Sequence, residues 1–245
     1  MNLSQTQNPK TLLPALRIGC AAARANLVPG LILQAAAAFL LLSYYNSPTL
    51  RDTLHGVENL KMRWGPLYTF LSAATFCGLL PWLFRIALPG LCPRRPWAEL
   101  LFGLLYWGAI CQVTDQFYQF QAWLWGELVC GSRDANHPWV IAVKTACDML
   151  LFTPAIAAPC NAISHLWKDR DFSFSKTRQA LRGHWYRDIV MPSLVPNWVI
   201  WTPGIALTYA LPQPLQLPMA NLIGCFWALL CITIASKTQT RNPAV

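Results

Sequence analysis

Residues 139 to 167 read WVIAVKTACDMLLFTPAIAAPCNAISHLW, and this stretch decides the fold class. It is long enough to cross a bilayer as a helix, which takes about 20 apolar residues. Its only Lys, Arg, Asp or Glu residues are Lys144 and Asp148. A charge at membrane depth costs about 3 kcal/mol on insertion scales, so such residues pair or face a polar cavity. Because Lys144 and Asp148 are four residues apart, the sequence predicts that they pair on one helical face.

Two prolines, Pro154 and Pro159, interrupt the same stretch. Each proline lacks a backbone N–H and so leaves a carbonyl without its helical donor. In lipid, only neighbouring helices or trapped water satisfy such a carbonyl. We therefore expect this helix to lie inside a bundle formed by the rest of the chain.

The composition of the whole chain indicates a membrane protein. The 245 residues are 55% hydrophobic and 12% charged, whereas soluble domains carry about 25% charged residues. The mean hydropathy is +0.34. The net charge of +9 does not indicate nucleic-acid binding, because the basic residues fall between apolar segments instead of forming a stripe with stacking aromatics. The sequence predicts an all-α, polytopic integral membrane helix bundle whose main partner is the lipid bilayer.

Cysteine and histidine give no indication of a metal or cofactor. The nine cysteines never form C-x-x-C, and most lie in apolar segments, where they behave as small hydrophobes. The four histidines are scattered over loops and span ends. We expect no cofactor and no metal site.

The apolar segments predict six transmembrane helices. They are residues 25–50, 64–84, 100–126 and 139–167, and two more within the 48 uncharged residues 189–236. Three prolines at 212, 214 and 218 predict a turn between the last two spans, where no helix continues. Small residues at Ala74 and Gly78, and again at Ala220, Gly224 and Ala228, predict close helix packing. We divide the chain into an N-terminal arm, extra span and loop (1–64), a bundle (65–236) and a tail (237–245).

Lys and Arg predict the orientation of these spans. Six spans put both termini on one side, which then holds fourteen Lys and Arg, against four on the other side. The positive-inside rule places both termini in the cytoplasm or a matrix-like compartment. Of the basic residues, Lys61 is expected in an external loop. Residues 168–188 are either a basic helix on the membrane surface or a charged loop.

Residues 139–236 resemble the Mpv-seventeen family, which includes the peroxisomal membrane protein of twenty-two kilodaltons. A span of that family carries K-x-x-x-D-Q and then a proline six residues after the Asp. Lys144, Asp148 and Pro154 match this pattern, and Met149 replaces the Gln. The family then shows a basic linker ending in Trp, an N-[WY]-x-x-W-P motif, a proline-containing loop and a last span with a Trp. This chain has, in that order, Trp185, Asn197, Trp198, Trp201, Pro212 and Trp227.

The resemblance implies that the last four spans form an Mpv-seventeen-like bundle and that span one is an addition. The chain departs from the family pattern at Thr202, where the family has proline, and at Leu80, where it has an acid. Members of the family span the mitochondrial inner, peroxisomal and related membranes and are described as pore-forming or as maintaining solute balance. The implied location is therefore organellar in a eukaryote and the cell inner membrane in a bacterium. We also expect Asn197 and Trp201 to fix the packing of span five against span four, because a membrane-depth Asn gains about 1 kcal/mol from a hydrogen bond to another helix.

Polar residues at membrane depth are the candidate functional residues. One interpretation is that they line a path for small solutes or ions; the other is that Lys144 and Asp148 form a structural pair with Asp115 as third partner. The candidates are Lys144, Asp148, Asp115, Gln112 and Asn161.

Two further classes of function were weighed. An intramembrane aspartic enzyme is disfavoured because Lys144 beside Asp148 favours two ionised carboxylates instead of a shared proton; we expect no enzyme. A non-conducting scaffold or assembly factor, which recruits partners through residues 168–188, stays open, as does homo-oligomerisation.

Overall fold

The computed structural model describes residues 20, 24, 27–88 and 90–241. The described residues are 87% helical and contain no strand. The helices, with wider-turned π-helical segments labelled η, run in the order α2 (Leu27–Asn46), α3 (Pro48–Trp64), α4 (Pro66–Ala73), η1 (Ala74–Leu79), α5 (Leu80–Ala87), α6 (Pro96–Gln121), η2 (Ala122–Leu128), α7 (Pro138–Cys147), η3 (Asp148–Ala157), α8 (Ala158–Asp169), α9 (Phe174–Ala180), η4 (Tyr186–Val190), α10 (Met191–Tyr209) and α11 (Gln213–Arg241).

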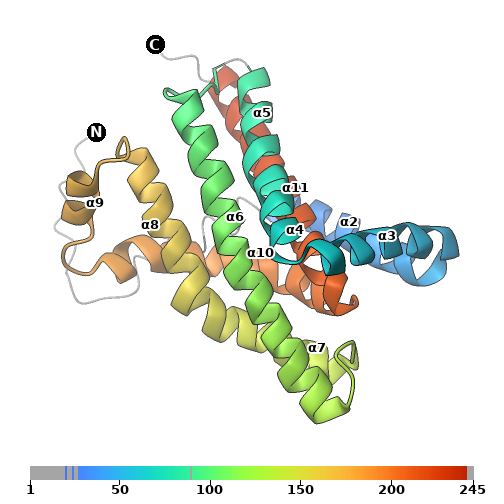
Figure 1. Cartoon of the computed structure of the whole chain (residues 1–245). Helices are drawn as coiled ribbons and strands as arrows, with labels where there is room; N and C mark the ends of the chain where they lie inside the picture. Colours follow the sequence, from blue (N-terminus) through green and yellow to red (C-terminus); the bar gives the residue numbers. More distant parts are fainter. Residues whose placement is uncertain (1–19, 21–23, 25–26, 89, 242–245) are drawn as a thin grey trace.

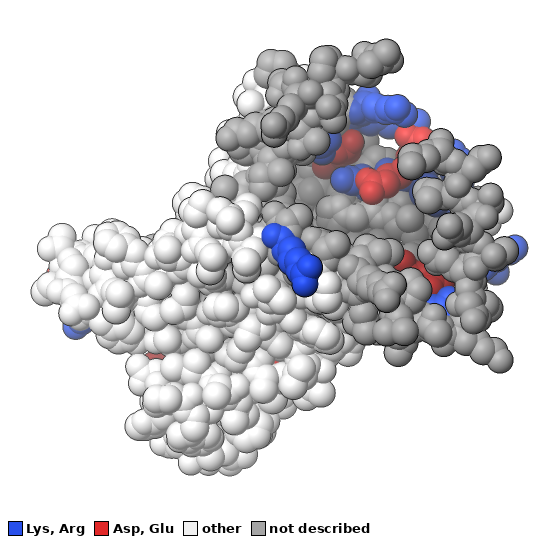
Figure 2. Space-filling model, turned by 180° about the vertical axis from the view of Figure 1, so that it is seen from behind, with Lys and Arg blue, Asp and Glu red and all other residues white. Residues whose placement is uncertain are grey.

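Within the described residues, four helices are long and apolar enough to cross a membrane. They are Leu27–Asn46, Pro66–Ala87, Pro138–Asp169 and Tyr186–Tyr209. Figure 2 shows that one face of the molecule is almost free of charged side chains, while Lys, Arg, Asp and Glu gather toward one side. The chain thus has the features of a multi-pass membrane protein.

Proline and glycine mark many of the helix boundaries. Proline occupies the first turn of α3, α4, α6 and α7, where its missing N–H would have had no helical partner. Ser47 caps α3 by accepting a bond from the Leu50 N–H at 3.3 Å. Gly65 separates α3 from α4 with a φ of +50°, a conformation that favours glycine.

The helix formed by α4, η1 and α5 packs along α6 (Figure 1). The two helices approach closely at Gly78 and Gly103, where a Cβ on Gly78 would lie 2.9 Å from the carbonyl carbon of Gly103. The predicted close packing at Gly78 is therefore confirmed. Such contact between backbones is possible only with small residues.

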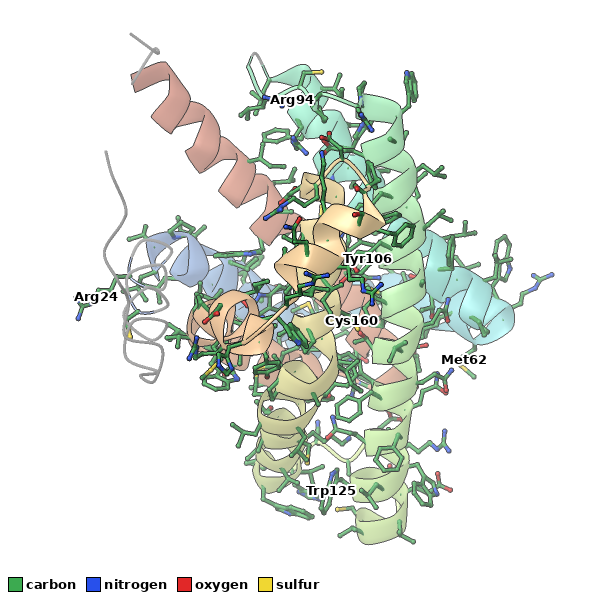
Figure 3. The ribbon with its side chains drawn as sticks, turned by 90° about the vertical axis from the view of Figure 1, so that its left-hand side faces the viewer. Arg24, Met62, Arg94, Tyr106, Trp125 and Cys160 are labelled. Carbon is green, nitrogen blue, oxygen red and sulfur yellow. The ribbon has the colours of Figure 1, made fainter. Side chains whose placement is uncertain are left out.

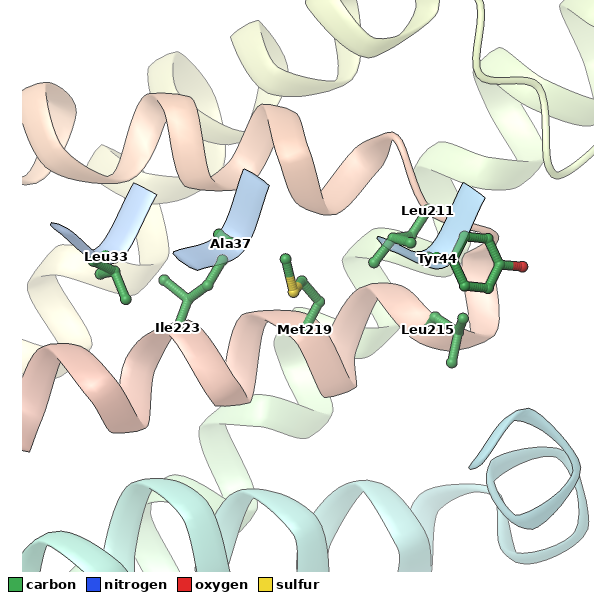
Figure 4. Packing of buried hydrophobic residues seen from close by; sticks show 7 residues of the cluster. All are labelled: Leu33, Ala37, Tyr44, Leu211, Leu215, Met219 and Ile223. Carbon is green, nitrogen blue, oxygen red and sulfur yellow. The ribbon is translucent and has the colours of Figure 1, made fainter. Parts of the chain in front are cut away.

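The N-terminal helix α2 packs on α10 and α11. Figure 4 shows Leu33 and Ala37 of α2 near Ile223 of α11, and Tyr44 near Leu211 and Leu215. Gly224 of α11 lies close to Cys77 and Trp201, as expected of a close-packing stripe: a Cβ there would meet the Cys77 sulfur at 3.4 Å. The N-terminal helix is thus part of the hydrophobic core.

Three local predictions were wrong. Residues 48–64 form α3 instead of a loop. The proline turn is shorter than expected, because α11 begins at Gln213 and contains Pro218. Pro214 lies in the first turn of α11, where a proline costs no hydrogen bond. Residues 168–188 are not one helix: α9 ends at Ala180, and Gly183 follows with a φ of +77°.

Candidate functional site

Asp115 is buried in α6 and pairs with Lys61 of α3. The Lys61 ammonium donates to the carboxylate at 2.7 Å, and both side chains are almost fully buried. The Thr69 hydroxyl donates at 3.0 Å and the Gln119 amide at 3.2 Å. The cation and these two donors satisfy the carboxylate. Asp115 is therefore the centre of a neutralised cluster joining α3, α4 and α6.

Asp148 is the second buried carboxylate, and it lies in a different cluster. Tyr209 of α10 donates its hydroxyl at 2.9 Å, and Thr153 donates at 3.3 Å. The Gln121 amide of α6 in turn donates to the Tyr209 hydroxyl at 2.5 Å. No Lys or Arg in the described part of the chain forms an ion pair with Asp148. This carboxylate is held by neutral donors alone.

The predicted pair of Lys144 and Asp148 is not formed. The backbone between the two residues is α-helical, since the Asp148 N–H donates to the Lys144 carbonyl, but their side chains do not meet. The π-helix η3 begins at Asp148. Its wider turn follows an i→i+5 pattern, and Thr153, five residues along, donates to Asp148. The expectation that Asp115 is a third partner of this pair is also wrong, because Asp115 binds Lys61.

Lys144 is only 1% exposed. Within the described residues it forms no ion pair. Its neighbour Thr145 has a buried hydroxyl without a hydrogen-bond partner, and the buried amide oxygen of Gln121 also lacks one. Buried polar groups without partners are uncommon and call for an explanation such as water or a ligand.

The carbonyls freed by the two prolines are capped by aromatic side chains. In the i→i+5 register of η3, the N–H missing at Pro154 would have reached the Met149 carbonyl. The Trp198 indole N–H donates to that carbonyl at 2.8 Å. In the same register Pro159 leaves the Pro154 carbonyl free, and the Tyr186 hydroxyl donates to it at 2.8 Å. A neighbouring helix thus supplies the donors, as expected from the sequence.

The remaining pore candidates lie apart from Asp148. Gln112 donates to the Pro66 carbonyl at 2.6 Å and so joins α6 to the start of α4. Asn161 is exposed and accepts a long bond, 3.4 Å, from the Tyr106 hydroxyl. Neither residue takes part in the hydrogen-bond cluster around Asp148.

Among the family-motif residues, Trp198 forms the hydrogen bond to predicted span four, through the Met149 carbonyl of η3. The side-chain oxygen of Asn197 is buried without a partner, contrary to the expectation that Asn197 bonds across helices. Trp201 packs on the hydrophobic cluster that contains Met149, Ile205 and Leu217. Trp227 packs on the cluster between α2 and α11.

Sequence reasoning missed Lys61, Gln121 and Tyr209 as members of the buried polar clusters. For Lys61 a signal existed, because it shares a helical face with Leu54 and Val57, seven and four residues earlier. Gln121 lies within the predicted span 100–126, but nothing in its sequence spacing points to Tyr209 as its partner. For Tyr209 no pattern in the sequence pointed to a partner.

A third polar cluster surrounds Asn221 of α11, whose amide donates to the Ser72 hydroxyl at 3.2 Å. The thiols of Cys77 and Cys111 contact Asn221 at 3.7 to 4.0 Å. The eight cysteines whose side chains are described are all free. Among the described residues no group of three His, Cys, Asp or Glu is placed to hold a metal.

The chain matches no family model, no curated protein and no solved structure.

Proposed function

We propose that the chain is a non-catalytic, weakly selective channel or solute-permeability factor, with its polar path next to Asp148. One observation carries this proposal: a nearly fully buried carboxylate held by neutral donors alone. Leaving a buried charge without a counter-charge costs several kcal/mol. Ionisable residues retained at membrane depth commonly mark substrate or ion pathways.

Unsatisfied polar atoms extend the proposed path beyond Asp148. They are the Gln121 amide oxygen and the Thr145 hydroxyl, next in the chain to the buried Lys144. Water or a passing ion would supply the partners that these atoms lack, and such groups replace part of an ion's hydration shell. The seam therefore consists of Asp148, Tyr209, Gln121, Lys144 and Thr145.

We assign Asp115 a structural role within this proposal. Lys61 neutralises it, and its hydrogen bonds hold three helices together. It lies six residues before Gln121 on the same helix, which is about 9 Å along the axis at 1.5 Å per residue. The structural cluster thus adjoins the seam.

We further propose that α6 with η2, and α11, are membrane spans as well, which gives six. The helix Pro96–Leu128 has 33 residues, long enough for the roughly 30 Å apolar layer. The resemblance to the Mpv-seventeen family stays a proposal, as does an organellar or bacterial inner membrane. Both are supported by the motif of Lys144, Asp148 and Pro154.

Flux measurements test the channel proposal. The purified protein is reconstituted into liposomes loaded with a small-ion indicator, and release is compared with protein-free liposomes. We expect release that depends on the amount of protein and that falls or changes in ion preference in Lys144→Gln and Asp148→Asn. Absence of release from folded, correctly inserted protein would contradict the channel and favour the scaffold.

The scaffold is retained as the second candidate because of the exposed basic residues of α9. Lys176 and Arg178 are both exposed on this short helix. Such residues attract acidic surfaces of partner proteins or membranes.

A further inference from the structure

An apolar groove lies between α6 and α8, away from the Asp148 seam. It has a volume of about 450 Å³, within the usual range of ligand pockets. Its wall is almost entirely apolar, formed mainly by Leu101, Phe102, Leu105, Tyr106, Trp167 and Phe172. A groove of this kind suits a hydrocarbon chain better than a polar metabolite.

The groove lies at one end of the bundle, where α6 begins and α8 ends. Figure 3 shows Arg94 at this end of α6 and Tyr106 further along the helix, on the side of α8. Arg94 and Arg95 precede α6, and Lys168 and Arg170 stand at the end of α8. Tryptophans such as Trp167 concentrate at the membrane–water boundary. The groove thus runs from a basic rim into the apolar part of the bundle.

A second, polar hollow adjoins the groove. It is lined by Arg178 and Arg182 together with Phe174, Ser175 and Gln179. The rings of Phe174 and Trp167 lie 5.2 Å apart and so connect the two hollows. Neither arginine forms an ion pair within the described part of the chain. Arginine without a carboxylate partner is well suited to bind phosphate.

The loop from Arg170 to Ser173 closes the end of the groove. Asp171 and Phe172 have φ values of +56° and +60°, which are unfavourable for residues other than glycine. This conformation places the Phe172 ring 5.9 Å from Phe102 and 5.1 Å from Trp167. Asp171 is also held by Arg95, at 3.9 Å between Nε and Oδ1.

The indole N–H of Trp167 is buried and has no hydrogen-bond partner. The wall of the groove offers few acceptors, because nearly all of its surface is apolar.

We propose that this groove and the adjoining hollow form a binding site for one anionic phospholipid. The acyl chain occupies the apolar groove between α6 and α8, and the phosphate headgroup binds Arg178 and Arg182. The charge of the hollow selects a membrane lipid with net negative charge over a zwitterionic one. The site is independent of the proposed channel, since it uses none of the residues of the Asp148 seam.

Native mass spectrometry of the full-length protein tests the site, with phosphatidylglycerol and phosphatidylcholine of equal chain length as probes. We expect one phosphatidylglycerol molecule to bind about 25-fold more tightly than phosphatidylcholine. Each arginine near an anionic headgroup is worth about fivefold in affinity. Arg178→Gln with Arg182→Gln should therefore weaken phosphatidylglycerol binding about 25-fold and leave phosphatidylcholine unchanged. The matched control is Lys176→Gln, which removes a charge from α9 outside the hollow and should have little effect.

Filling the groove with a larger side chain tests the binding of the acyl chain separately from the binding of the headgroup. Ala98→Phe should weaken the binding of both lipids. If this variant fails to fold, Ser164→Leu fills the groove from the opposite wall and should have the same effect. Equal affinity of the wild type for the two lipids would overturn the proposal. So would equal losses in Lys176→Gln and the arginine double variant, since only diffuse surface charge would then act. Unchanged binding in a folded groove-filled variant would also contradict it.

Discussion

The indole N–H of Trp198 donates to the backbone carbonyl of Met149 at 2.8 Å, and Pro154 follows that carbonyl by five residues. Five residues is the hydrogen-bond spacing of a π-helix. The proline, the wide turn and the tryptophan are therefore parts of one arrangement. The same π-helix begins at Asp148, the residue on which the proposed function depends.

Trp198→Phe should destabilise the protein by about 1–3 kcal/mol, because it leaves the Met149 carbonyl buried without a donor. Adding Pro154→Ala restores a backbone N–H at position 154 and should reduce that cost. The free energy of unfolding in micelles is measured for the wild type, both single variants and the double variant, and this cycle gives the coupling energy between Pro154 and Trp198. Trp227→Phe serves as the control, as Trp227 packs without a described indole bond. Additive effects of the two changes would contradict the link between Pro154 and Trp198.

Lys61→Met should destabilise the protein by about 3–5 kcal/mol, because Asp115 then stays buried without its cation. The double variant with Asp115→Leu should recover most of this loss, since no charge remains to be paired. Arg63→Met is the matched control: Arg63 is exposed two residues away, and the change should cost less than about 0.5 kcal/mol. Equal losses for Lys61→Met and Arg63→Met in chemical unfolding would show that the buried pair is not important.

Gly78→Ala should destabilise the packing of η1 on α6 by about 1–3 kcal/mol, because the added Cβ overlaps the Gly103 backbone. Gly56→Ala in α3 meets nothing within 4 Å and should be neutral or stabilise by up to about 1 kcal/mol. Thermal unfolding of the two purified variants gives the comparison. A Gly78→Ala protein as stable as Gly56→Ala would mean that the two helices do not meet at this point.

Tyr209→Phe removes the hydroxyl that joins Gln121 to Asp148, and it should cost about 1–3 kcal/mol because two buried polar groups lose a partner. Tyr45→Phe removes an exposed hydroxyl that donates to the Ala210 carbonyl and should cost less. Chemical unfolding of the two variants measures this difference in stability. If the Asp148 cluster is also part of the conducting path, ion flux should change in Tyr209→Phe and not in Tyr45→Phe.

The apolar run lengths made the membrane helices predictable. The stretch 139–167 was predicted as a span, and the helix occupies Pro138–Asp169. The local geometry of the site was less predictable. The pairing of Lys144 with Asp148 was expected from their four-residue spacing. The Asp148 carboxylate instead accepts from Thr153 and from Tyr209 of another helix, which that spacing does not reveal. Lys61 was missed because charges between apolar runs were assigned to loops, whereas its helix buries it against Asp115.

Current recording in planar bilayers tests the Asp148 seam most directly. Wild type, Asp148→Asn and Lys144→Gln are compared across a salt gradient, with the exposed Asp52→Asn as a control for loss of one negative charge. The account predicts discrete conductances. The reversal potential should shift toward lower cation preference in Asp148→Asn, toward higher cation preference in Lys144→Gln, and not at all in Asp52→Asn. Silent bilayers from folded protein, or one reversal potential shared by all four proteins, would contradict it.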